Sequence, residues 1–264
     1  MRTKWIAALL IMFANTLMAQ QKSFTLNDLL GGGSSYWQLQ PERRYTKWWG
    51  NKALETTPES VNELESGKPL FTVSQINEWV GENLFRSGHN VTFPYADQPL
   101  LLLQARNKYV LVDFKAQKPV WTLSYSREAR NLDWNAVSRN LAYTEKGNLY
   151  VQTAEGEVHQ VSTDGSVDGS DNIIYGQTVH RNEFGIDKGT FWSPDGKRLA
   201  FYRMDQSMVP SYPQVDITQR IATTYTDHYP MAGEASHQVK VGVYDVTTKQ
   251  TTYLQLVGAA EDYH

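Results

Sequence analysis

The sequence predicts an all-β protein, an incomplete β-propeller of about four blades that are each a four-stranded antiparallel sheet. One pattern occurs twice: Trp134 lies seven residues before Leu141, and Trp192 lies seven residues before Leu199. Alanine and an aromatic residue follow each leucine. The two tryptophans are 58 residues apart. Since a plain blade takes about 40 to 50 residues, the second copy must hold an insert.

Two short helices are expected among the strands. Residues 25–30 form the first, with Thr25 as N-cap and a run of glycines after it. The apolar residues of segment 74–85 have helical spacing, and Ser74 can cap it, so this segment is predicted to be a helix that connects two blades.

Most of the remaining chain has the short strands and turns of a β-protein, and eight Trp and fifteen Tyr suit such a fold. Ser193-Pro194-Asp195-Gly196 is a β-turn sequence between two of the strands. The other strands are expected at 45–49, 69–73, 100–104, 108–114, 120–125, 148–153, 158–163, 240–247 and 251–256.

Residues 1–19 have the pattern of a signal peptide, and residues 20–264 are expected to form the mature propeller part. Arg2 and Lys4 precede an apolar run at 5–14, and Ala19 ends the segment. The run is shorter than the roughly 20 residues that span a bilayer; the alternative is a membrane anchor that is left uncut. The pattern predicts a periplasmic or secreted bacterial protein.

Composition excludes several kinds of site. Without cysteine the chain has no disulfide, no catalytic thiol and no cysteine metal site. A net charge of −3 gives no reason to expect nucleic-acid binding. The six histidines show no HExxH spacing, and the Asp-rich loop 164–171 lacks the distal glutamate of a calcium loop. No cofactor and no metal are expected, and a G-x-S-x-G nucleophile elbow is absent.

The stretch 175–233 contains four motifs in order: HRNEFG, FWSPDG, FYRMDQSMVP and HYPMAG. This combination resembles the β-propeller half of the dipeptidyl peptidase IV family, which consists of secreted serine exopeptidases of the prolyl oligopeptidase type. Within the family, the stretch is most similar to bacterial prolyl tripeptidyl peptidases and dipeptidyl peptidases IV. A weaker resemblance extends back to residues 22–30. The N-terminal propeller part alone is covered.

The resemblance implies where a substrate would bind. In the family, glutamates on a short insert bind the free α-ammonium of a peptide, and Glu183 matches one of them. Asn182 stands where the dipeptidyl enzymes have a second glutamate, so the resemblance does not decide between dipeptide and tripeptide release. The alternative is a solvated turn in which Glu183 pairs with Arg181 or Lys188. Arg106 is a possible substrate contact, although a surface hairpin residue is the favoured interpretation.

The function predicted from this resemblance is the substrate-gating and amine-binding portion of a secreted serine exopeptidase that cleaves after proline. The catalytic Ser, Asp and His would come from a C-terminal α/β-hydrolase domain, so no catalytic residue is assigned here. Peptides with a free N-terminus are the expected partners, and a homodimer is a possible assembly. The alternative function is a non-enzymatic periplasmic propeller that acts as a binding or scaffold module.

Overall fold

The computed structural model describes residues 23–32, 36, 41, 43–166, 172–255 and 257–258. The chain divides into two units, residues 1–44 and 45–264. In the first unit, helix α2 (Leu26–Leu29) begins after Thr25, as predicted. The backbone N–H and the hydroxyl of Thr25 both donate to the Asp28 carboxylate, each at 2.8 Å. The predicted signal peptide lies outside the described residues.

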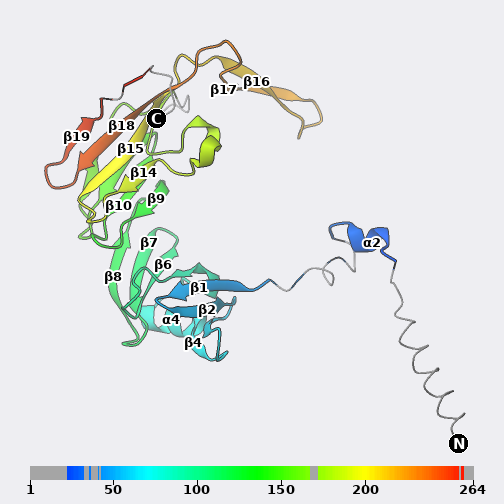
Figure 1. Ribbon diagram of the computed structural model, residues 1–264, viewed down its shortest axis with the longest axis vertical. Coiled ribbons are helices and arrows are strands. Elements are labelled where there is room, and N and C mark those ends of the chain that lie inside the picture. Colours follow the sequence, from blue (N-terminus) through cyan, green and yellow to red (C-terminus); the bar gives the residue numbers. More distant parts are fainter. Residues whose placement is uncertain are drawn as a thin grey trace, which may run out of the picture. The chain divides into compact units, whose positions relative to one another are not determined.

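The described part of the second unit contains three sheets of four antiparallel strands, each in sequence order, which we call blades 1 to 3 (Figure 1). Blade 1 consists of β1 (Tyr45–Trp49), β2 (Lys52–Thr56), β3 (Ser60–Glu63) and β4 (Pro69–Thr72). Blade 2 consists of β5 (Val91–Thr92), β6 (Leu100–Ala105), β7 (Lys108–Asp113) and β8 (Lys118–Ser124). Blade 3 consists of β9 (Arg130–Trp134), β10 (Leu141–Glu145), β11 (Asn148–Gln152) and β12 (Val158–Gln160).

Blade 4 has a different construction, because its first strand is divided. Both β13 and β14 pair with β15, which continues to β18 and β19. A separate hairpin, β16–β17, lies between β15 and β18 in sequence and projects from the blades in Figure 1. No strand was predicted from the sequence in either half of this hairpin. The strands are β13 (Ile173–Tyr175), β14 (Thr190–Trp192), β15 (Arg198–Asp205), β16 (Ser211–Asp216), β17 (Thr223–His228), β18 (Gln238–Asp245) and β19 (Gln250–Tyr253).

The repeated tryptophan pattern marks equivalent positions in blades 3 and 4. Trp134 is the last residue of β9 and pairs with Leu141 of β10. Trp192 is the last residue of β14 and pairs with Leu199 of β15. The prediction of a repeated blade is therefore confirmed at the level of strand register.

The core is a series of apolar layers between consecutive blades. In β6, Leu101 and Leu103 pack in a cluster with blade 1, whereas Leu100 and Leu102 pack in a cluster with blade 3. Successive side chains of a strand point to opposite faces. A strand that is covered on both faces therefore needs a continuous apolar run, which is what four consecutive leucines provide.

The predicted helix at 74–85 is shorter and starts earlier than expected. Helix α4 is Val73–Val80, and its N-cap is Thr72 rather than Ser74. The Gln75 N–H donates to the Thr72 hydroxyl at 3.2 Å, and the Thr72 N–H donates to the Gln75 side chain at 2.9 Å, which forms a capping box. Gly81 ends the helix with a left-handed φ of 73°. A 3-10 turn, η1 (Gly88–Asn90), precedes β5. Among the described residues, no helix has the length and apolarity to cross a bilayer.

Candidate functional site

The candidate site is an insert that divides the first strand of blade 4. Tyr175, at the end of β13, pairs with Arg203 of β15, and Thr190, at the start of β14, pairs with Phe201. Tyr202 is the residue of β15 between Arg203 and Phe201. Its carbonyl accepts from Gly176 N–H at 2.9 Å, and its own N–H donates to the Gly189 carbonyl at 3.0 Å. The chain between the two glycines therefore leaves and re-enters the sheet beside a single residue of β15, Tyr202. We call this point the neck of the insert.

The two glycines are required by this neck. A Cβ on Gly189 would lie 1.9 Å from the backbone oxygen of Gln177, so no side chain fits there. Gly176 has a left-handed φ of 61°, which glycine adopts at little cost. Glycine stands at both ends of the insert because the outgoing segment at Gly176 and the returning segment at Gly189 run close together beside Tyr202 of β15.

The insert carries a short 3-10 turn, η2 (His180–Gly185), with unusual backbone geometry. His180, Asn182 and Phe184 have φ values of 50°, 63° and 58°, all left-handed. Such a conformation costs on the order of 1–3 kcal/mol for a non-glycine residue, and asparagine tolerates it best. Three such residues in one turn persist because the structure around them fixes the backbone, and such strain concentrates at functional sites.

The base of the insert is anchored, while its tip is exposed. Val179 is 2% exposed and packs with Ile174 and Met204. The Thr178 hydroxyl donates to the Ile186 carbonyl at 2.9 Å and closes the base. By contrast, the side chain of Phe184 is 72% exposed. The arrangement presents the tip of the turn on a rigid support.

Glu183 and Asn182 lie at this exposed tip. Among the described side chains, which do not include that of Arg181, none forms an ion pair or hydrogen bond with the Glu183 carboxylate. Lys188, one of the two partners considered for Glu183, instead contacts the Asp133 carboxylate at 3.3 Å. Glu183 is exposed, so its carboxylate is accessible from solvent; the alternative pairing with Arg181 falls on a side chain outside the described ones.

A cavity of about 220 Å³ lies at the root of the insert. Asp133 of β9 is its central charged group and accepts a hydrogen bond of 2.8 Å from the Thr190 hydroxyl as well as the contact from Lys188. The cavity therefore lies at the junction of blades 3 and 4 and has polar walls. It is lined by Asn131, Leu132, Asp133, Gly176, Thr178, Asp187, Lys188, Gly189 and Thr190.

Arg106 occupies the two-residue turn between β6 and β7, with a left-handed φ of 54°. Its side chain is exposed, and its carbonyl accepts a hydrogen bond of 3.3 Å from the Tyr125 hydroxyl. In an antiparallel blade, the loop between strands two and three emerges at the end where strand one begins. The β6–β7 turn in blade 2 and the insert in blade 4 thus lie toward corresponding ends of their blades.

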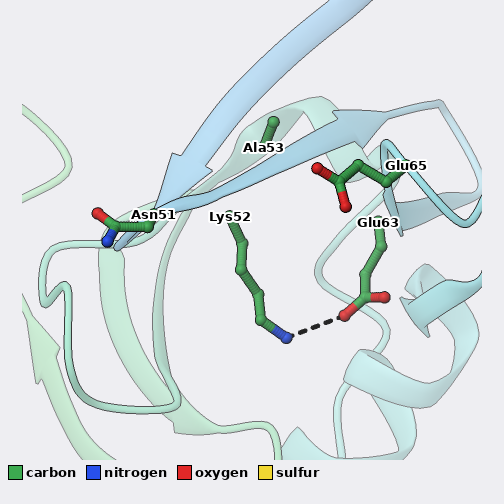
Figure 2. Close-up of a pocket in the computed structure, with 5 residues that line it drawn as sticks. All are labelled: Asn51, Lys52, Ala53, Glu63 and Glu65. Atoms are coloured by element: carbon green, nitrogen blue, oxygen red, sulfur yellow. Dashed lines mark hydrogen bonds and ion pairs between the residues drawn. The ribbon is translucent and has the colours of Figure 1, made fainter.

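A second pocket, of about 190 Å³, lies on blade 1 and contains none of the predicted site residues (Figure 2). In Figure 2 the Lys52 side chain extends toward Glu63, and their charged atoms are 3.1 Å apart. A hydrogen bond from Lys52 is the main reason that the pKa of Glu63 lies below its ordinary value. This pocket is lined by a surface ion pair whose charges already satisfy each other.

Sequence reasoning missed one contact at the site. His180, in η2, and His237, which precedes β18, form a buried pair in which two ring nitrogens are 2.6 Å apart. The residues are 57 positions apart in sequence, and no spacing rule relates them. Among the described residues, no group of three or more potential ligands could hold a metal ion.

The family model for the dipeptidyl peptidase IV N-terminal region matches residues 86–264. The chain belongs to the dipeptidyl peptidase IV family. In this family a protein of Bacteroides ovatus, named as a dipeptidyl aminopeptidase IV, has a solved structure that matches with a TM-score of 0.76 and 41% identity. The match covers 92% of this chain and 34% of that one.

One further solved structure and one further sequence relative also match this chain. The structure of Porphyromonas gingivalis dipeptidyl peptidase 4 shares the fold, with a TM-score of 0.61 over 83% of this chain and 33% of that chain at 23% identity. A protein of Fusarium vanettenii, named as dipeptidyl-aminopeptidase B, is 30% identical over 58% of this chain and 18% of its own length. The chain thus spans about a third or less of the relatives it matches. The family resemblance and the propeller fold are confirmed.

Proposed function

We propose that this chain is the substrate-gating and amine-binding part of a secreted serine exopeptidase that releases di- or tripeptides after proline. The observation that carries the proposal is Glu183, whose carboxylate lies on an exposed tip held by an anchored and strained insert. Family membership supports peptides as the substrate class. The anchored base supports a fixed binding point rather than a mobile surface loop.

The proposed amine binding follows from the opposite charges of the peptide N-terminus and the Glu183 carboxylate. A peptide α-amine has a pKa of about 7.7–8.0, so most of it is cationic at neutral pH. The exposed Glu183 carboxylate can hold it through short, charge-assisted hydrogen bonds. These bonds gain strength when the bound peptide and the rest of the full-length protein exclude water from the ion pair. The distance from this point to the catalytic serine then sets how many residues precede the cleaved bond. Position 182 carries an amide, which can add a hydrogen bond but no second charge.

The catalytic step requires residues that we assign elsewhere. The sequence contains no nucleophile elbow, and the chain spans about a third of the matched dipeptidyl peptidase structures. We assign the Ser, Asp and His to a C-terminal domain of the full-length protein. Under this proposal residues 1–19 direct export to the periplasm or the medium, and the propeller admits short peptides and excludes folded proteins. Assembly as a homodimer remains a prediction.

Product analysis with the full-length protein tests this function. Peptides that begin Ala-Pro and Ala-Ala-Pro, each with a free and with an acetylated N-terminus, are incubated with the enzyme and analysed by mass spectrometry. We expect di- or tripeptide release after proline from the free-amine peptides. A non-enzymatic binding module would release nothing from any of them.

The same assay reads the role of position 182. The variant N182E adds a second carboxylate and should shift preference toward dipeptide release if this turn sets the register. Its backbone is left-handed, with a φ of 63°, so glutamate costs about 1 kcal/mol more than asparagine there. N182D, which also adds charge and tolerates this backbone better, is the matched control for that strain.

A further inference from the structure

The insert is tied to a distant part of blade 4 by two imidazole rings. His180 is the first residue of η2, three residues before Glu183, and His237 directly precedes β18. The Nε2 atom of His237 lies 2.6 Å from the Nδ1 atom of His180, and the ring centroids are 4.5 Å apart. Each residue is 7% exposed. One nitrogen must donate and the other must accept, which fixes how the two rings face each other.

The contact between the two rings lies at a segment whose backbone conformation is strained and needs support from outside the turn. His180 has a φ of 50°, and two further left-handed non-glycine residues follow within the turn. A relaxed backbone would leave this conformation, because each such residue is strained. A hydrogen bond to the His180 ring from outside the insert opposes that relaxation. The direction of the Glu183 side chain depends on the backbone angles of the residues between it and His180.

We propose that the His180–His237 pair is a positioning element for the amine-binding carboxylate, in which His237 holds the turn that aims Glu183. This inference rests on the proposed function. His237 lies where the chain returns from the β16–β17 hairpin, so the position of Glu183 is set by the start of β18 as well as by the neck at Tyr202. Neither histidine contacts the substrate in this proposal.

The test uses two His237 variants of the full-length enzyme that differ by one methylene. In H237Q the amide can reach the position of Nε2 and restore the bond to His180, whereas in H237N it is too short. The measured quantity is the ratio of kcat/KM for a free-amine peptide to kcat/KM for the same peptide with an acetylated N-terminus. We expect H237Q to stay close to wild type. H237N should lower the ratio by about 10-fold, mainly through KM, since a 1 Å misplacement can cost up to about 100-fold.

A matched control separates positioning from general stability. His159 is also buried, and its Nδ1 atom lies 3.0 Å from the Tyr244 hydroxyl at the junction of blades 3 and 4. H159M, which fills the space without restoring this bond, should lower the Tm and leave the ratio unchanged. If H237N does not fold, H237M replaces it, because methionine fills the space without restoring the bond, and it is held to the same outcomes.

Combining the variants distinguishes the two proposals. In an E183Q background, H237N should change the ratio no further, because the group that it positions has lost its charge. If E183Q lowers the ratio and H237N and H237Q have equal ratios, the positioning role is overturned while the amine-binding role stands. If E183Q leaves the ratio unchanged, the proposed function itself fails.

Discussion

The indole N–H of Trp192 donates a hydrogen bond of 2.9 Å to the backbone carbonyl of Asp133. This bond joins the first strand of blade 4 to the first strand of blade 3, beside the cavity at the root of the insert. The Asp133 carboxylate adds a second tie, to the Thr190 hydroxyl at 2.8 Å. The insert that carries Glu183 is therefore mounted on a junction between two blades that is itself hydrogen-bonded.

Removing the indole donor tests that junction. W192F should lower the free energy of unfolding by about 1 kcal/mol through loss of this bond, in addition to the lost ring area. W134F is the matched control, since it changes the equivalent residue of blade 3, whose indole N–H has no hydrogen-bond partner among the described residues. Chemical denaturation of the full-length protein measures both. An equal or larger loss for W134F would contradict the assignment.

The neck of the insert predicts a large effect for a small substitution. G189A places a Cβ 1.9 Å from the Gln177 oxygen, which forces the two chain segments apart. We expect a loss of roughly 2–4 kcal/mol in stability, as for other sterically forced backbone changes, together with a weaker preference for free-amine peptides. G156A is the control: its Cβ meets no atom within 4 Å, so its cost should be limited to its left-handed φ of 98°. Equal Tm shifts for the two variants would contradict the claim that close packing at the neck excludes a side chain at position 189.

Acid should weaken a polar contact that holds β13 against β15. Asp164 accepts hydrogen bonds from the Tyr175 hydroxyl and from Arg203, the latter at 3.0 Å. Partial burial acts to raise the pKa of Asp164, but these hydrogen bonds and the Arg203 charge hold it below its ordinary value of 3.8. A carboxylate with a lowered pKa stabilises the fold above its unfolded pKa, and this contribution is lost as the pH falls through the folded pKa.

The variant D164N should therefore have a lower Tm than wild type at pH 7, and the difference should shrink below about pH 4. Thermal unfolding of both proteins across this range measures it. A Tm difference that is the same at pH 7 and pH 3 would show that the charge of Asp164 does not stabilise the fold.

The chain by itself should lack peptidase activity. It contains no nucleophile elbow, so residues 20–264 should not turn over Gly-Pro or Ala-Ala-Pro chromogenic substrates. The full-length protein, assayed in parallel, is the positive control. Robust turnover by the purified chain, free of contaminating peptidase, would overturn the assignment of catalysis to another domain.

Prediction from sequence succeeded where a pattern is local and repeated. The repeated spacing from tryptophan to leucine predicted that Trp134 and Trp192 occupy equivalent positions in two blades. The structure pairs Trp134 with Leu141 and Trp192 with Leu199, because a hairpin of fixed length allows one register. Prediction failed for the β16–β17 hairpin, whose side chains are largely exposed and include none that is fully buried. The N-cap of α4 was misplaced by two residues because Thr72 and Ser74 are both good caps, and the side chain of Gln75 decides between them.

The candidate site was predictable in identity but not in geometry. Family motifs pointed to Glu183, and the excess length of the second repeat indicated an insert. The division of the first strand, the neck at Tyr202 and the bond between His180 and His237 depend on residues far apart in sequence. Such contacts arise from the packing of the blade and leave no periodic signal.

The measurement that tests the central claim most directly is the effect of E183Q on the preference for a free N-terminus. The substitution keeps the shape of the side chain and removes its charge. Loss of one partner of a desolvated charge pair costs about 2–5 kcal/mol, which lowers kcat/KM for free-amine peptides by roughly 30-fold to several thousand-fold. Acetylated peptides, already poor substrates, should be cleaved about equally by both enzymes. The account predicts a collapse of the free-amine to acetylated ratio in E183Q, and an unchanged ratio would contradict it.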